Sequence, residues 1–430
     1  MSEPVLSPAR DRRDAGRAGQ VALASLLGAL VSYVVLWLGA RTLSKPDNTV
    51  LLTFFSILFA VYGVLSGVAT ETTRSVATGI RDRRTVGPPV WVAGAAVAVV
   101  AGALVLALSP WWQPEVLHRT SPVLVAVLVA AAIGYAFHSV VVGSLVGSGW
   151  WRESAVVLAT DALCRLALCL LVVLVVGAST TLLAAATAGG AVAWLLVLLA
   201  MPHVRDALRR RTDSAPAALA RRMSASVLAQ AASAILIVGF PALLSVTTSS
   251  ADFRNSAPLL LAISLTRAPV LIPLNAVQGL VVSHLVHAPS VGVRLVLRAV
   301  AVVTVVTAVG GALAWLVGPW LMGTLFGDAY RIDGGVLAGL TVGACAIAAL
   351  TLSGAATQAS SAHTWFLGGW ALAALVAFAV LLAPGSIEQR SVTALVAGPA
   401  AGLLVHAVGF LRAVSRRGRR RQEEGVAHDG

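Results

Sequence analysis

Residues 122–145 read PVLVAVLVAAAIGYAFHSVVVGSL and contain no aspartate, glutamate, lysine or arginine. A helix of about 20 such residues spans the hydrocarbon core of a bilayer. The whole chain of 430 residues is 58% hydrophobic and only 11% charged, whereas a soluble domain has roughly 25% charged residues. This composition excludes a soluble enzyme and predicts a membrane protein that crosses the bilayer many times.

Twelve apolar segments are long enough to cross the membrane as helices. They are 19–39, 49–70, 90–109, 122–145, 154–176, 180–201, 224–246, 258–283, 295–317, 335–356, 364–383 and 391–411. The longest internal connection, 202–223, separates six segments from six. We therefore predict an all-α polytopic protein with about twelve transmembrane helices in two pseudo-symmetric six-helix lobes around a central cavity. The expected parts are a basic tail 1–18, a lobe 19–201, the linker 202–223, a lobe 224–411 and a disordered basic tail 412–430.

The lysine and arginine residues fall mainly on one side of this arrangement. Both tails and the even-numbered connections hold 23 of the 31, the opposite side holds 6, and Arg165 and Arg267 lie within spans. Basic connections stay in the cytoplasm. We expect a bacterial inner-membrane protein with both termini in the cytoplasm. We interpret its formal charge of +13 as a consequence of membrane topology and not as a sign of nucleic-acid binding. The three cysteines lie in apolar runs without metal-ligand spacing, so neither a metal site nor a disulfide is predicted.

Two charged pairs lie within predicted spans. Glu71 and Arg74 are three residues apart near the cytoplasmic end of the second span, and Asp161 and Arg165 are four apart in the fifth. Such spacings place both charges on one helical face, where they can neutralise each other. Intramembrane charges also mark binding sites and proton paths. For Glu71 and Arg74 an interfacial salt bridge and a role in substrate binding or proton coupling both remain open, whereas Asp161 and Arg165 are read as structural.

The eighth span carries the strongest polar signal. Arg267 has no carboxylate within four positions, and Pro269, Pro273, Asn275 and Gln278 follow it. Each proline removes a backbone donor and disturbs the carbonyl four residues before it, so this helix should bend and expose carbonyls. We expect a polar cavity in which Arg267 meets an anionic substrate. The alternative is that Arg267 bonds to a backbone carbonyl of a neighbouring helix.

Gly239 and Pro241 lie near the middle of the seventh span. A glycine and a proline so close together predict a kink. We interpret this kink as a hinge and assign gating to Gly239 and Pro241, together with Pro269 and Pro273.

Three motifs resemble one known superfamily. They are Leu38–Leu43 with Thr73–Ala77, the Thr266–Pro269 segment with its following Pro, Asn and Gln, and Gly318–Pro319 with Leu325–Tyr330. With the six-plus-six plan they resemble, over essentially the whole chain, the multidrug/oligosaccharidyl-lipid/polysaccharide (MOP) exporter superfamily, and within it the polysaccharide-biosynthesis (Wzx-type) flippases. Twelve spans, and no arginine in the first, favour an oligosaccharide-lipid flippase over a lipid II flippase.

The resemblance implies that the chain flips a polyprenyl-phosphate- or diphosphate-linked glycan from the inner to the outer leaflet by alternating access. Arg267 would then meet the diphosphate, and Asn275 and Gln278 the sugars. Neither covalent chemistry nor a cofactor is required. Membrane lipids, and cell-envelope glycosyltransferases or a polymerase, are the expected partners. An exporter of a small solute or drug, a membrane glycosyltransferase and an assembly scaffold are the alternatives.

Overall fold

The computed structural model describes residues 8–83, 85–267, 270, 292–359 and 363–428. Contacts between residues divide the chain into two compact units, Met1–Ala234 (unit 1) and Ile235–Gly430 (unit 2). The described elements are helices, apart from one isolated β-bridge between Pro89 and Arg211. The all-α prediction is therefore confirmed.

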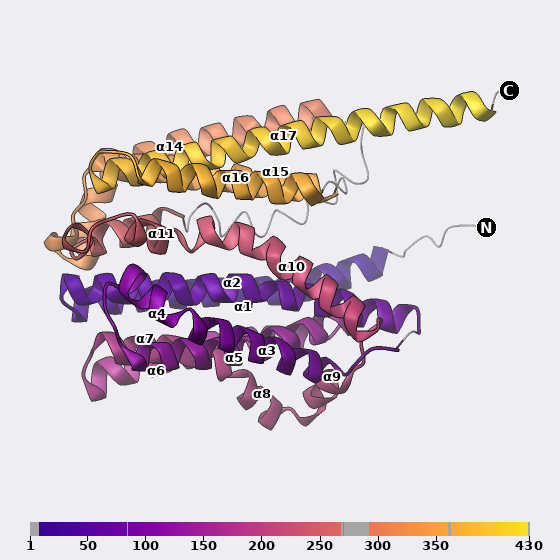
Figure 1. The fold of residues 1–430 in the computed structure, drawn as a ribbon, viewed down its shortest axis with the longest axis horizontal. Coiled ribbons are helices and arrows are strands. Elements are labelled where there is room, and N and C mark those ends of the chain that lie inside the picture. Colours follow the sequence, from indigo (N-terminus) through magenta and orange to yellow (C-terminus); the bar gives the residue numbers. More distant parts are fainter. Residues whose placement is uncertain (1–7, 84, 268–269, 271–291, 360–362, 429–430) are drawn as a thin grey trace. The chain divides into compact units, whose positions relative to one another are not determined.

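Unit 1 consists of several long helices and a few short ones (Figure 1). Its α-helices are α1 Pro8–Thr42, α2 Lys45–Arg81, α3 Val90–Ala107, α4 Ser109–Trp112, α5 Pro122–Gly147, α6 Trp151–Leu171, α7 Thr180–Gly189, α8 Trp194–Ala200, α9 Arg205–Arg209 and most of α10 Pro216–Ile237. Local sequence explains several starts: the hydroxyls of Ser44, Ser121 and Ser179 accept the backbone N–H three residues later. These are N-caps that satisfy donors the helix leaves unpaired.

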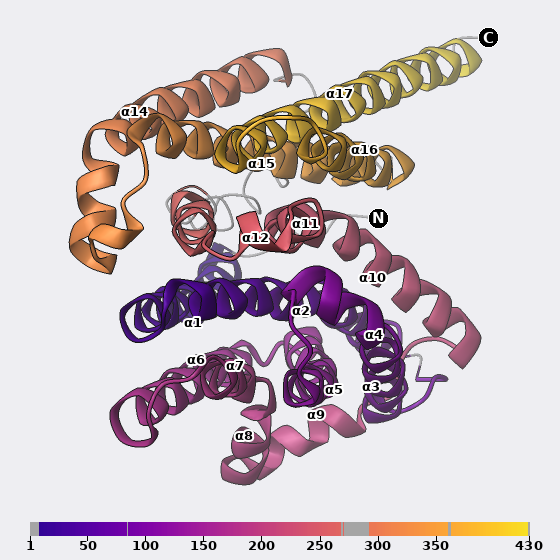
Figure 2. The same cartoon turned by 60° about the vertical axis from the view of Figure 1, so that its left-hand side comes forward.

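Unit 2 contains the remaining helices (Figure 2). They are α11 Phe240–Val246, α12 Ser250–Phe253, the helix Ala257–Arg267, α14 Gly292–Phe326, α15 Gly334–Ala359, α16 His363–Leu381 and α17 Ile387–His428. The long helices α15 and α16 both pack against α17.

The described helices match the predicted spans. Nine are long and apolar enough to cross a membrane, and the number is eleven if each of two bent pairs is one span. The pairs are Thr180–Val192 with Trp194–Ala200, bent by 41°, and Pro216–Ile237 with Phe240–Val246, bent by 69°. Of the expected eighth span, 258–283, the described part is the helix that ends at Arg267.

Helix α17 continues from the last predicted span into the basic tail, as far as His428. Arginine, glutamine, glutamate and alanine dominate this tail, and all four are good helix formers that extend a helix already begun in the last span.

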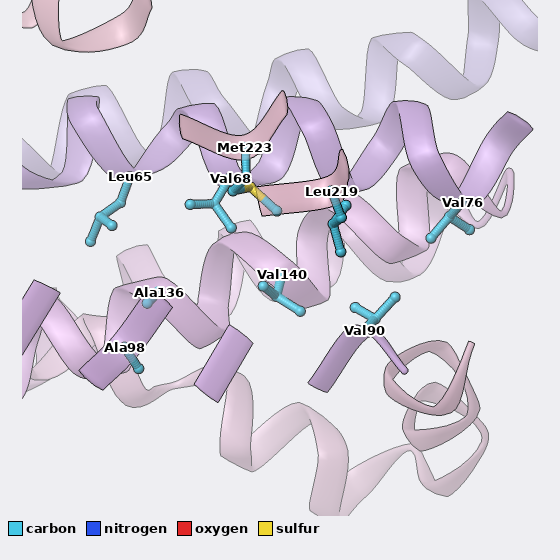
Figure 3. Packing of buried hydrophobic residues seen from close by; sticks show 9 residues of the cluster. All are labelled: Leu65, Val68, Val76, Val90, Ala98, Ala136, Val140, Leu219 and Met223. Atoms are coloured by element: carbon cyan, nitrogen blue, oxygen red, sulfur yellow. The ribbon is translucent and has the colours of Figure 1, made fainter. Parts of the chain in front are cut away.

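The first turns of α10 pack into unit 1. Leu219 and Met223 join Val68 of α2 and Val140 of α5 in one buried cluster (Figure 3). Gly67 of α2 lies so close to α10 that an added Cβ would come within 2.6 Å of the Ser226 carbonyl oxygen. The contacts therefore group residues 216–234 with unit 1, whereas the sequence places the division between the lobes in the connection 202–223.

Candidate functional site

Arg267 is a buried cation at the end of the helix Ala257–Arg267. Only 6% of the surface of Arg267 is exposed. Its Nη1 donates a hydrogen bond of 2.6 Å to the carbonyl oxygen of Ile237. The guanidinium carbon lies 5.6 Å from the centre of the Phe240 ring, within the range of a cation–π interaction. Arg267 is thus held from two sides by residues at the break between α10 and α11.

The break itself follows from Gly239 and Pro241. Pro241 has no N–H, so the carbonyl of Ile237, four residues earlier, cannot receive its usual helical hydrogen bond. The donor is supplied instead by Arg267. At Gly239 an added Cβ would lie 2.8 Å from the Ile235 carbonyl oxygen, so this turn requires a glycine. The predicted kink is present, with a bend of 69°, and its role as a hinge stays a prediction.

Four other predicted site residues lie outside the described residues. They are Pro269, Pro273, Asn275 and Gln278. Their expected roles in gating and sugar binding stay predictions.

Arg74 and Glu71 form the salt bridge that their spacing predicts. Arg74 Nη2 lies 2.6 Å from Glu71 Oε1, and Arg74 Nε donates to Oε2 at 2.9 Å. A third member, Asp213, comes from the connection before α10 and lies 3.0 Å from Arg74 Nη1. The Asp213 carboxylate also accepts from the hydroxyls of Ser75 and Ser214. We call these residues the α2–loop network.

A second arginine also reaches the α2–loop network: Arg222 Nη1 lies 3.5 Å from Asp213 Oδ2. Burial raises the pKa of Asp213, but hydrogen bonds from Arg74, Ser214 and Ser75 outweigh burial and lower its pKa to about 2. Arg74 already faces two carboxylates, so an anionic substrate would have to displace one of them. The network resembles a structural connection more than an open binding site, although sequence reasoning left both roles open.

A buried polar and aromatic cluster lies elsewhere in unit 1. Arg165 Nη2 lies 2.7 Å from Asp161 Oδ2, as the spacing predicts, and its guanidinium carbon lies 5.0 Å from the Phe59 ring centre. Tyr135 stacks on Tyr62 at 3.9 Å and on His138 at 4.9 Å between ring centres. Sequence reasoning missed both tyrosines and His138. Tyr62 and Tyr135 are 73 positions apart and only the fold brings them together.

No group of three or more histidine, cysteine, aspartate or glutamate side chains capable of holding a metal ion occurs among the residues that the structure describes. The predicted residues instead fall into two sets of different character. Arg74 and Glu71 belong to the α2–loop network, where Arg74 is paired with two carboxylates. Arg267 lies with Gly239 and Pro241 at a helix break, where one of its donors is bound to a backbone carbonyl.

This fold is found in transporters. The chain is similar to an inward-facing multidrug resistance MATE family transporter of the MOP superfamily, with 15% identity, a TM-score of 0.65 and coverage of 93% of this chain and 96% of that one. It is also similar to a MOP superfamily transporter from Pyrococcus furiosus, with 16% identity, a TM-score of 0.67 and coverage of 93% and 95%. The chain therefore has the fold of the MOP superfamily, as its motifs predicted.

Sequence similarity gives the narrower family. No family model matches the sequence. An uncharacterized protein of Mycobacterium bovis is 35% identical over 407 residues, which are 92% of each chain. An uncharacterized protein of Mycobacterium tuberculosis is 36% identical over 401 residues, again 92% of each. The chain belongs to the family of these mycobacterial proteins.

Proposed function

We propose that the protein is a membrane transporter that moves an anionic, polyprenyl-phosphate- or diphosphate-linked glycan from the inner to the outer leaflet. The observation that carries this proposal is Arg267, a buried arginine at a break in a membrane helix, within a fold shared with MOP transporters over 93% of the chain. The narrower Wzx-type assignment rests on the motifs around residues 38–43, 266–269 and 325–330.

Arg267 suits a phosphate better than a neutral cargo. A guanidinium presents five donors in a planar fork and can bind two phosphate oxygens at once. At the break, Arg267 donates to the neutral carbonyl of Ile237. A diphosphate that accepted this hydrogen bond instead would replace the neutral acceptor with a charged one. Charge-assisted hydrogen bonds are roughly twice as strong as neutral ones, which favours the exchange.

The membrane potential can drive such a cargo outward. Moving one negative charge out of an inside-negative cell releases up to about 2.3 kcal/mol per 100 mV. The lipid tail stays in the bilayer, and only the polar head needs shelter. Neither covalent chemistry nor a cofactor enters this scheme. In the cell, glycosyltransferases that build the glycan, or a polymerase that consumes it, would be the partners, and both termini would lie in the cytoplasm.

Export of a small solute or drug is the second candidate. The fold similarity favours it equally, because one neighbouring structure is a multidrug resistance transporter. The Pyrococcus furiosus structure is described as having a binding pocket of reversed polarity that suggests a different function. The charge of Arg267 is what favours an anionic head group here.

Reconstituted vesicles separate the two candidates. Fluorescent polyprenyl-diphosphate sugar is placed in both leaflets, and a membrane-impermeant quencher measures how much reaches the outer leaflet. We expect wild-type protein to move the lipid, Arg267→Ala to abolish movement and Arg267→Lys to retain part of it. Arg254→Ala, which removes an exposed arginine, is the matched control. If wild-type vesicles leave the lipid in place but accumulate cationic drugs, the flippase proposal is wrong.

A further inference from the structure

Unit 2 contains a buried histidine that joins three helices. His406 of α17 is 1% exposed. Its Nε2 lies 3.1 Å from the carbonyl oxygen of Phe366 in α16, and its Nδ1 lies 2.9 Å from the hydroxyl of Ser353 in α15. Both α15 and α16 pack against α17, and the three helices run side by side in Figures 1 and 2.

The surrounding residues are shaped around the imidazole. An added Cβ on Gly369 of α16 would overlap the ring of His406, so a glycine leaves the space the ring occupies. The Phe366 ring lies parallel to the imidazole, with 5° between the planes and 6.1 Å between the centres. An apolar side chain in this space would need no hydrogen-bond partners. His406 has two, the Phe366 carbonyl and the Ser353 hydroxyl, and they distinguish this site from ordinary apolar packing.

The hydrogen bonds of His406 determine which of its two ring nitrogens, Nδ1 or Nε2, can gain and lose a proton. A carbonyl only accepts, so the contact with Phe366 places a proton on Nε2 in every state. Ser353 can act either way, because its hydroxyl lies 2.9 Å from His406 Nδ1 and also 2.9 Å from the Leu350 carbonyl oxygen. With neutral His406 the hydroxyl donates to Nδ1. With protonated His406, Nδ1–H donates to the hydroxyl oxygen, and the hydroxyl turns to donate to Leu350.

We propose that His406 is a reversible proton-binding site formed by α15, α16 and α17. A proton from water binds Nδ1, the Ser353 hydroxyl rotates, and no covalent bond breaks. Every polar atom of the network has a partner in both states, so neither state carries the penalty of an unpaired buried group. Unlike the transport proposal, this one does not depend on the identity of the cargo.

The ionisable groups on the described side chains of these helices are few. The part of α16 at 364–381 has none, and that of α15 at 334–357 has the thiol of Cys345. On α17, Glu388 and Arg390 lie 18 and 16 residues from His406, about 24–27 Å along the helix. Arg412, six residues away or about 9 Å along the axis, lies over Trp365. The proton's charge would therefore be held by the Leu350 and Phe366 carbonyls and the Ser353 hydroxyl.

Nitrogen-15 NMR tests the site directly. The full-length protein, with its eight histidines labelled, is placed in nanodiscs of uncharged lipid and titrated between about pH 5 and 8, where histidines change charge. The spectrum of His406→Gln assigns the His406 signals. We expect them to pass reversibly from one protonated nitrogen to two. Half-exposed His203 is the reference within the same sample.

Two serine variants test the mechanism. Ser353→Ala removes the group that bonds Nδ1 in both states, so the His406 midpoint should shift from its wild-type value by up to about one pH unit, the effect of one hydrogen bond. Ser391→Ala, which also removes a buried hydroxyl bonded to the carbonyl four residues before it, should leave the midpoint unchanged. Signals from a single protonated nitrogen across the whole range in folded wild-type protein would overturn the proposal, whatever the variants do.

Discussion

Arg267 Nη1 donates at 2.6 Å to the carbonyl of Ile237, the carbonyl whose helical donor is missing because residue 241 is a proline. Sequence reasoning assigned these two features to different roles, Arg267 to binding and Pro241 to gating. The structure places them in one hydrogen-bonded unit. A ligand that takes Arg267 away from Ile237 would leave that carbonyl without this donor. Binding and bending of the seventh span are thereby expected to be coupled.

Pro241→Ala tests this coupling. Alanine restores the N–H that can bond to the Ile237 carbonyl, so the bend of 69° should decrease. Spin labels on either side of Gly239 would report an increased distance, and transport should slow while expression stays near normal. Pro399→Ala, which changes a proline inside α17, is the control. An unchanged distance would show that Gly239 alone causes the break.

The α2–loop network should weaken in acid. Asp213 has a pKa of about 2 in the folded protein and roughly 3.9 in an unfolded chain, so its stabilisation is present above about pH 4 and is lost as the pH falls toward 2. Because Arg74 is half-exposed, this amounts to about 1–2 kcal/mol. In thermal unfolding, Asp213→Asn should lower the Tm at neutral pH, and the difference from wild type should vanish near pH 2. A constant difference would contradict the pairing.

The buried pair of Asp161 and Arg165 should respond strongly to loss of one member. Arg165→Met leaves a carboxylate uncompensated and is expected to cost about 3–5 kcal/mol, whereas replacing both partners costs far less. Thermal unfolding of Arg165→Met, Asp161→Asn and the double variant measures this. If the double variant is as unstable as Arg165→Met, the two side chains do not depend on each other.

Contact between α2 and α10 depends on Gly67. An added methyl group would lie 2.6 Å from the Ser226 carbonyl oxygen, and backbone cannot move aside as a side chain can. Gly67→Ala should therefore destabilise the protein by about 1–3 kcal/mol, and it should increase labelling of a cysteine placed at Ser226. Gly28→Ala is the control, since a Cβ at Gly28 meets nothing within 4 Å.

The predicted orientation is open to direct labelling. Cysteines placed at exposed Asp47, next to Asn48, or at Glu115, Arg254, Asp328 or Glu388 should react with a membrane-impermeant reagent added outside intact cells. A cysteine at Ala215 should react only after the cells are opened. External labelling at Ala215 would reverse the orientation.

Sequence patterns located the spans because the length of an apolar run can be read from consecutive residues, without knowledge of the fold. Nine to eleven of the expected segments coincide with described helices or bent helix pairs, and the kink at Pro241 follows from one missing N–H. The partners of charged residues were harder to foresee. Asp213 joins Arg74 from 139 positions away and His406 meets Ser353 from 53 away, and no periodicity records such separations. The bend before Trp194 was also missed, since no proline marks it.

Unit 1 ends at Ala234 and unit 2 begins at Ile235, both inside the continuous helix α10. The connection between the units is therefore a stretch of helix and not a slack loop. A helix has a fixed rise of about 1.5 Å per residue and cannot lengthen to absorb displacement. The helical path is broken only after Ile237, which already lies inside unit 2. Gly239 has the widest range of backbone dihedral angles at this break, so the local compliance of the chain there is set by very few bonds.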